Sequence, residues 1–93
     1  SDAVGFRSDA TRRNLIDSSR EILTNPNRAE EILTRRIQNV TNEGGDPTES
    51  VMALKEYQEN PEGFLQANKM LYAGLDQPGY QAWKDAQPKE SSQ

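Results

Sequence analysis

Residues 60–83 read NPEGFLQANKMLYAGLDQPGYQAW, and this stretch decides the fold class. It opens on Asn60-Pro61. Asparagine suits the position before a helix because its side-chain oxygen accepts a hydrogen bond from an unpaired backbone N–H. Proline is tolerated at the first helical position, since the N–H that it lacks would have no partner there. Apolar residues then recur at helical spacing from Phe64 to Leu71. A second proline, in Gln77-Pro78, marks the start of a further short helix.

The same pattern, an Asn or Asp followed by proline at a helix start, occurs earlier in the chain, at Asn25-Pro26 and Asp46-Pro47. Gly44-Gly45 is predicted to end the second helix, over residues 27–41, because glycine is the usual residue just past a helix end. No segment shows the alternation of apolar and polar residues that is typical of a strand. The sequence therefore predicts an all-α domain of about five short helices, packed as antiparallel helical hairpins. The predicted helices span residues 8–24, 27–41, 47–58, 61–73 and 79–86.

Length and composition limit the size of this domain. The chain has 93 residues, of which 32% are apolar, so it can fill one thin core and its stability is expected to be marginal. We predict a flexible N-terminal segment over residues 1–8, a helical domain over 9–86, and a flexible tail over 87–93 with the composition of a linker. The chain is expected to be a fragment of a longer protein.

The chain lacks residues on which several classes of function usually depend. The chain contains no cysteine and no histidine, which removes thiolate chemistry, disulfides, the commonest general base and the commonest metal ligand. Its serines and threonines therefore lack a histidine to activate them. Residues 42–46 lack the ligand spacing of a calcium-binding loop, and Gly44-Gly45 lacks that of a phosphate-binding loop. We predict no catalytic, cofactor or metal site, and hence no enzyme. No apolar run approaches the roughly 20 residues of a membrane-spanning helix.

Charge is distributed unevenly along the chain. The net charge is −4. Up to Val40 seven arginines accompany six acidic residues, whereas after Val40 four lysines accompany nine. A dedicated nucleic-acid binder usually carries a concentrated basic excess. Contact with nucleic acid is therefore expected to be weak at most, and protein partners are the more fitting expectation.

Five side chains are candidates for partner contact. Arg13 and Arg20 lie seven residues apart, on one face of the first predicted helix. Arg35 and Arg36 lie near the end of the second, where cations suit the helix dipole. The plain alternative for these arginines is an ordinary solvated helix face. Most aromatic side chains are expected in the core, but Trp83 on the last short helix is the one expected to be partly exposed, where it could anchor a partner.

The order of elements in the second half resembles a known family. Gly44-Gly45-Asp46-Pro47 opens a helix, Asn60-Pro61-Glu62-Gly63-Phe64 opens the next, and Leu71-Tyr72-Ala73-Gly74-Leu75 closes it before Tyr80-Gln81-Ala82-Trp83. This succession resembles the helical-hairpin region of internal virion proteins of tailed bacteriophages. These proteins are ejected with the genome and are called DNA transfer or injection proteins. The resemblance covers roughly residues 28–86.

The resemblance implies a helical module, without catalytic residues, of a protein that packs in the virion interior. Such a protein leaves with the DNA and assembles by protein–protein contact, with itself or with other virion proteins. Family members are usually several hundred residues long and rich in alanine and glutamine, whereas this chain is short and charged. The alternative is a cytoplasmic bacterial adaptor or regulatory domain that holds a partner helix in a groove. A groove of that kind should expose leucine or methionine in one patch, whereas a conduit subunit should self-associate.

Overall fold

The computed structural model describes residues 2–88, with side chains from residue 11 onward. Within these residues the chain forms five α-helices and one short 3₁₀ helix, and no strand, so the predicted all-α class is confirmed. A flexible tail was predicted over residues 87–93, of which 89–93 lie outside the described residues. The elements are α1 (Asp2–Thr24), η1 (Pro26–Arg28), α2 (Ala29–Asn42), α3 (Thr48–Glu59), α4 (Pro61–Leu75) and α5 (Gln77–Ala86).

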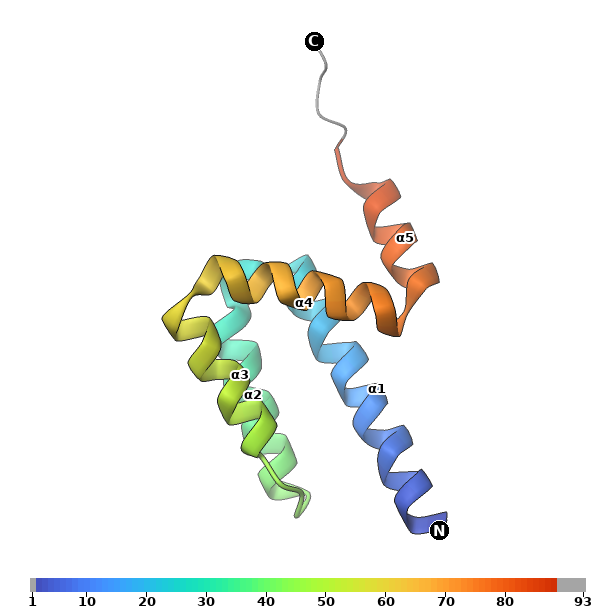
Figure 1. Cartoon of the computed structure of the whole chain (residues 1–93), viewed down its shortest axis with the longest axis vertical. Helices are drawn as coiled ribbons and strands as arrows, with labels where there is room; N and C mark the ends of the chain where they lie inside the picture. The colour runs from blue at the N-terminus through green and yellow to red at the C-terminus, as the bar shows by residue number, and fades with distance from the viewer. Residues whose placement is uncertain (1, 89–93) are drawn as a thin grey trace.

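The helices form a flat, two-layered arrangement measuring 54 × 30 × 16 Å. In Figure 1, α3 lies in front of α2 as an antiparallel hairpin, and α4 crosses in front of the upper ends of α1 and α2. The largest contact surfaces accordingly join α2 to α3 and α1 to α4. Helix α5 turns away from the bundle and makes its principal contacts with α4. The layers therefore leave one broad face of α4 without a covering helix.

The starts marked by Pro47 and Pro61 were predicted to within one residue, but the caps differ among the proline-marked starts. The Asn60 side chain accepts a hydrogen bond from the backbone N–H of Gly63 at 3.1 Å. In contrast, no side-chain cap forms at Asn25, and Pro26 begins η1 rather than an α-helix. The first helix also begins earlier than predicted, at Asp2 instead of Ser8. Ser1 and Asp2 are residues of the cap type, so the sequence did carry a local signal for the earlier start.

The last helix also begins earlier than predicted, at Gln77 rather than near Gly79. The reason is Asp76, whose side chain accepts a hydrogen bond from the Gly79 N–H at 3.1 Å. Gly79 suits this cap, because a Cβ atom there would collide with the Asp76 carboxylate and the Tyr72 hydroxyl. The predicted stop at Gly44-Gly45 is present as well, with Gly44 at φ +80°, a backbone conformation that side chains other than glycine rarely adopt.

The core lies where α1, α2, α3 and α4 converge. Its fully buried apolar members come from the end of α1 and the first half of α2, namely Ile22, Ala29, Ile32 and Leu33. Partly buried residues of α3 and α4 pack against them, including Tyr57 and Phe64, whose rings meet edge to face at 5.9 Å. This core is small for a chain of 93 residues, so each of its side chains contributes a large share of the stability.

Two polar side chains, Asn68 and Arg36, make three hydrogen bonds between helices in the same region. The buried Asn68 amide on α4 donates a hydrogen bond of 3.0 Å to the backbone carbonyl of Ser19 on α1. Arg36 on α2 donates to Ser18 on α1 at 2.8 Å and to Ser50 on α3 at 3.0 Å. The three serines are buried or nearly so, and their small side chains let the helices approach closely. These bonds fix how α4 and α3 lie on the first two helices.

Substitution of Ile32 tests the position of this core. Ile32 is 1% exposed, so Ile32→Ala should lower the free energy of unfolding by about 2–5 kcal/mol, from lost transfer energy and the cavity left behind. Met70→Ala is the matched control: Met70 is 69% exposed, and its truncation should change stability by ~0.5 kcal/mol or less. Urea denaturation followed by circular dichroism measures both. Equal losses for the two variants would show that the core lies elsewhere.

Candidate interaction surface

The four candidate arginines do not gather into one basic cluster. Arg13 and Arg20 are exposed on α1, and Arg20 forms an ion pair with Asp17 at 3.0 Å. Arg35 on α2 reaches Glu21 on α1, with 2.6 Å between Nη2 and Oε1. Exposed pairs of this kind add little to stability. The geometry places Arg35 and Arg36 together between α1 and α2, and Arg13 apart from them.

Arg36 occupies the most enclosed position of the four. It lies between α1, α2 and α3, where its guanidinium holds the serine hydroxyls of two neighbouring helices. Burial lowers the pKa of Arg36 from its ordinary value, while the nearby carboxylate of Glu49 acts in the opposite direction. Two of its nitrogens already donate to protein oxygens. These contacts make Arg36 a link between helices.

Two of the hollows on the described surface are lined mostly by polar side chains. One, of about 210 Å³, lies between α1 and α2. It contains Arg35 and Arg36, but also the carboxylates of Asp17, Glu21 and Glu43. Three acidic groups beside two arginines offer no excess of positive charge to hold a phosphate.

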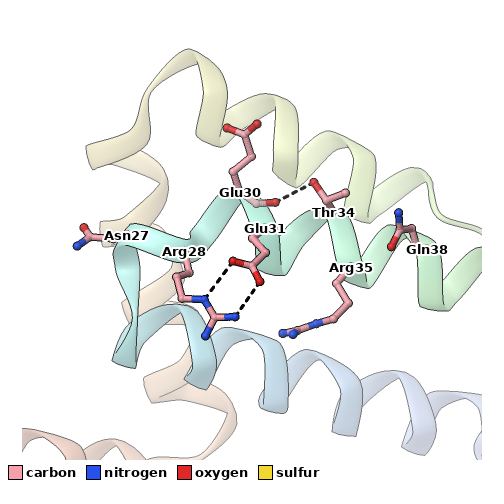
Figure 2. A pocket seen from close by; sticks show the side chains of 7 residues that line it. All are labelled: Asn27, Arg28, Glu30, Glu31, Thr34, Arg35 and Gln38. Atoms are coloured by element: carbon pink, nitrogen blue, oxygen red, sulfur yellow. Dashed lines mark hydrogen bonds and ion pairs between the residues drawn. The ribbon is translucent and has the colours of Figure 1, made fainter.

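The second hollow is an open surface depression along α2 (Figure 2). Its arginine and glutamate residues pair within the helix: Arg28 Nη2 lies 2.8 Å from Glu31 Oε2, and Thr34 donates to the Glu30 carbonyl at 2.8 Å. The Glu31 pKa is lowered by this hydrogen bond and by the charge of Arg28. The described residues contain no group of three or more side chains that could hold a metal ion. Arg28 and Glu31 thus satisfy each other beside this hollow.

Trp83 lies on α5, half-buried and stacked on Tyr80, with ring centroids 5.8 Å apart. Lys84 lies over the other aromatic of the pair, 5.8 Å from the centre of the Tyr80 ring. No residue of α5 is fully buried. The two rings therefore shield each other on a helix that projects from the bundle (Figure 1), where the edge of the stack remains accessible.

Three residues, Tyr72, Asp76 and Gly79, fix the start of α5 and form what we call the joint at α5. The buried Tyr72 hydroxyl on α4 donates to Asp76 at 2.8 Å, and the same carboxylate caps α5 through the Gly79 N–H. Arg12 on α1 adds a hydrogen bond of 3.3 Å to the Leu75 carbonyl at the end of α4. Because the turn is held from both sides, α5 is oriented relative to α4.

The most exposed apolar side chains are ones that the sequence pattern assigned to apolar helix stripes. Met70 and Leu71 on α4 are 69% and 43% exposed, and Met52 and Val51 on α3 are 58% and 46% exposed. The position of Asn68 explains the exposure of Met70. Asn68 points into the interior, and a residue two positions further on lies about 200° around the helix. Met70 therefore faces outward.

Met70 lies at the centre of a helix face without charge. We define the outer α4 face as the exposed residues Gly63, Gln66, Ala67, Met70, Leu71 and Gly74. The charged residues of α4, Glu62 and Lys69, flank this face, about 80° and 100° around the helix from Met70. A Cβ atom added at Gly74 would meet no atom within 4 Å, whereas one added at Gly63 would collide with the Asn60 side chain. The space in front of the face is therefore open at its Gly74 end. Exposed apolar area of this kind marks contact sites.

Comparisons with protein-family models, curated protein sequences and solved structures find no significant match to this chain. No described helix is long and apolar enough to cross a membrane. The outer α4 face is therefore assigned as a candidate surface from geometry alone.

Acid should weaken the joint at α5. The hydrogen bond from Tyr72 and that from the Gly79 N–H lower the pKa of Asp76. A carboxyl group with a lowered folded-state pKa stabilises the fold above its unfolded pKa of about 3.9, and this contribution is lost as the pH falls through the folded value.

Asp76→Asn should therefore show a smaller loss of unfolding free energy than the parent chain as the pH falls below about 4. Chemical denaturation at a series of pH values measures this difference. Gln81→Ala, an exposed change on the same helix, leaves the Asp76 carboxylate in place and should show the pH dependence of the parent chain. Parallel pH curves for Asp76→Asn and the parent would contradict the assigned hydrogen bonds.

Proposed function

We propose that this chain is a non-enzymatic helical module that acts by protein–protein assembly, as part of a phage DNA ejection protein during genome delivery. The observation that carries the assembly part is the outer α4 face, open and uncharged, with Met70 69% exposed at its centre. Burying such a face against another protein removes apolar area from water, and the residues that define the face carry no charge that has to be desolvated.

The phage part of the proposal rests on the sequence resemblance over residues 28–86. It is supported by the order of helices in the second half, where α3, α4 and α5 follow one another with short connections. A module of this kind would be carried in the virion interior and would leave with the DNA. Its contacts would be made with other copies or with other virion proteins.

The alternative is the bacterial adaptor that holds a partner helix in a groove. A helix-binding groove is hydrophobic, with pockets for apolar anchors. The two hollows described above are lined mostly by charged and polar side chains. Met70 and Leu71 are exposed together, as the adaptor predicts, but they lie on the outward-facing surface of a helix and line neither of these hollows. These observations favour assembly through a convex face over the binding of a helix in a cleft.

The phage assignment is tested by mass spectrometry on purified particles of the source phage, before and after triggered genome release. The tryptic peptide from Met70 to Lys84 should be found in intact particles and be depleted after release. A capsid protein that stays with the particle provides the internal control. Absence of this peptide from intact particles would remove the virion assignment and leave the adaptor as the better account.

A further inference from the structure

We infer that α5 opens by itself, leaving α4 and unfolding while α1 to α4 stay folded, and that one hydrogen bond controls this opening. That bond runs from the Tyr72 hydroxyl to Asp76 Oδ2, and we call it the latch. The inference goes beyond the proposed function and does not depend on it. Three features of the structure support it: what α5 buries, how it is connected to α4, and where the latch lies.

Helix α5 has no buried side chain to anchor it. None of its ten residues is fully buried, whereas each of α1, α2, α3 and α4 contributes at least one buried residue, such as Ile22, Ile32, Ser50 and Tyr72. Isolated helices shorter than about 12–15 residues are marginal in water. The helical state of α5 therefore depends on its cap and on its contacts with α4.

The connection between α4 and α5 is a single residue. Helix α4 ends at Leu75 and α5 begins at Gln77, with Asp76 between them at φ −148° and ψ 75°. Asn60 connects α3 to α4 with a similar backbone, at φ −152° and ψ 81°, but both helices at that corner bury side chains. The corner at Asp76 is different because only one of its two helices is anchored in the interior.

The latch joins this corner to the folded interior. Tyr72 is 0% exposed, so the packing around its ring fixes the position of the hydroxyl. The hydroxyl donates to Asp76 Oδ2 at 2.8 Å, while Oδ1 of the same carboxylate accepts the Gly79 N–H. The other side-chain hydrogen bonds within α5 that the described residues form, such as that from Gln81 to Asp85, are local. One carboxylate thus holds both the cap of α5 and its polar link to α4.

The α4 side of the corner is fixed separately. Arg12 on α1 donates to the carbonyl of Leu75, the last residue of α4, at 3.3 Å. This bond does not involve α5, so it remains when the latch breaks. The aromatic pair of Tyr80 and Trp83 belongs wholly to α5. Opening therefore releases the aromatic pair and leaves the end of α4 in place on α1.

Hydrogen exchange of the whole chain, followed by mass spectrometry, tests whether α5 opens by itself. Relative to an unstructured chain, amides of residues 81–86 should exchange at least about tenfold faster than the most protected amides of α2. Ile32→Val removes one methylene from the core, where Ile32 is 1% exposed. It should speed exchange of those α2 amides by about two- to tenfold and leave exchange in α5 unchanged, because the opening of α5 does not disturb the core. Equal acceleration in both helices would show one cooperative unit and overturn the inference.

Tyr72→Phe tests the latch, because it removes the hydroxyl and keeps the ring. Exchange in α5 should become about tenfold faster, as expected for the loss of one hydrogen bond to a charged group. Tyr57→Phe is the matched control, since it makes the same change at a half-buried ring that packs on Phe64, away from the joint at α5. It should leave exchange in α5 unchanged.

A second variant keeps the latch testable if Tyr72→Phe does not fold. Asp76→Ala removes the latch and the cap together, at a half-buried position outside the core. It should speed exchange in α5 at least as much as Tyr72→Phe does. Unchanged exchange in α5 after either substitution would overturn the latch.

Discussion

The hydrogen bond from the Asn68 amide to the Ser19 carbonyl, 3.0 Å long and buried, is the contact that sets the arrangement of this chain. It holds α4 across α1, at a place where Ser18 and Ser19 are small enough for the two helices to approach. An unpaired amide in this position would cost about 1–3 kcal/mol, so α4 is held in one rotation about its axis. With Asn68 inside, Met70 has to face outward. The surface proposed for assembly is thus a consequence of this interior contact.

The helices could be predicted from the sequence because their signals are local. Proline at Pro61 and Pro78, and the glycine stop at Gly44-Gly45, act through backbone geometry that needs no tertiary contact. The rotation of the helices could not be predicted in the same way. The apolar stripe of α4 was read through Met70, but the buried place belongs to the polar Asn68, whose partner is a backbone carbonyl 49 residues away. Burial of a polar side chain depends on such a partner, and no local pattern reports it.

Among the candidate contact residues, too, some sequence-based expectations agree with the structure and others do not. Trp83 was expected to be partly exposed on the last helix, and its half-buried stack on Tyr80 agrees with that expectation about exposure. Arg36 was expected near a helix end for its charge, yet it bridges Ser18 and Ser50 on two other helices. Charge pattern alone does not distinguish an arginine that meets solvent from one that joins helices, because both follow the same helical periodicity. Only the position of α3 decides between them.

Stability and assembly are coupled in a domain of this kind. The fully buried apolar residues are few among the described side chains, and the remaining order comes from caps, serine contacts and one buried amide. A partner that binds the folded chain but not the unfolded one stabilises it by RT ln(1 + [L]/Kd), which is negligible for a weakly bound partner in dilute solution and grows with concentration. If the chain assembles as proposed, a high local concentration of its partner would therefore strengthen both the fold and the assembly, whereas dilution would weaken both. A domain with so thin a core would gain more from such a partner than a domain with a large core.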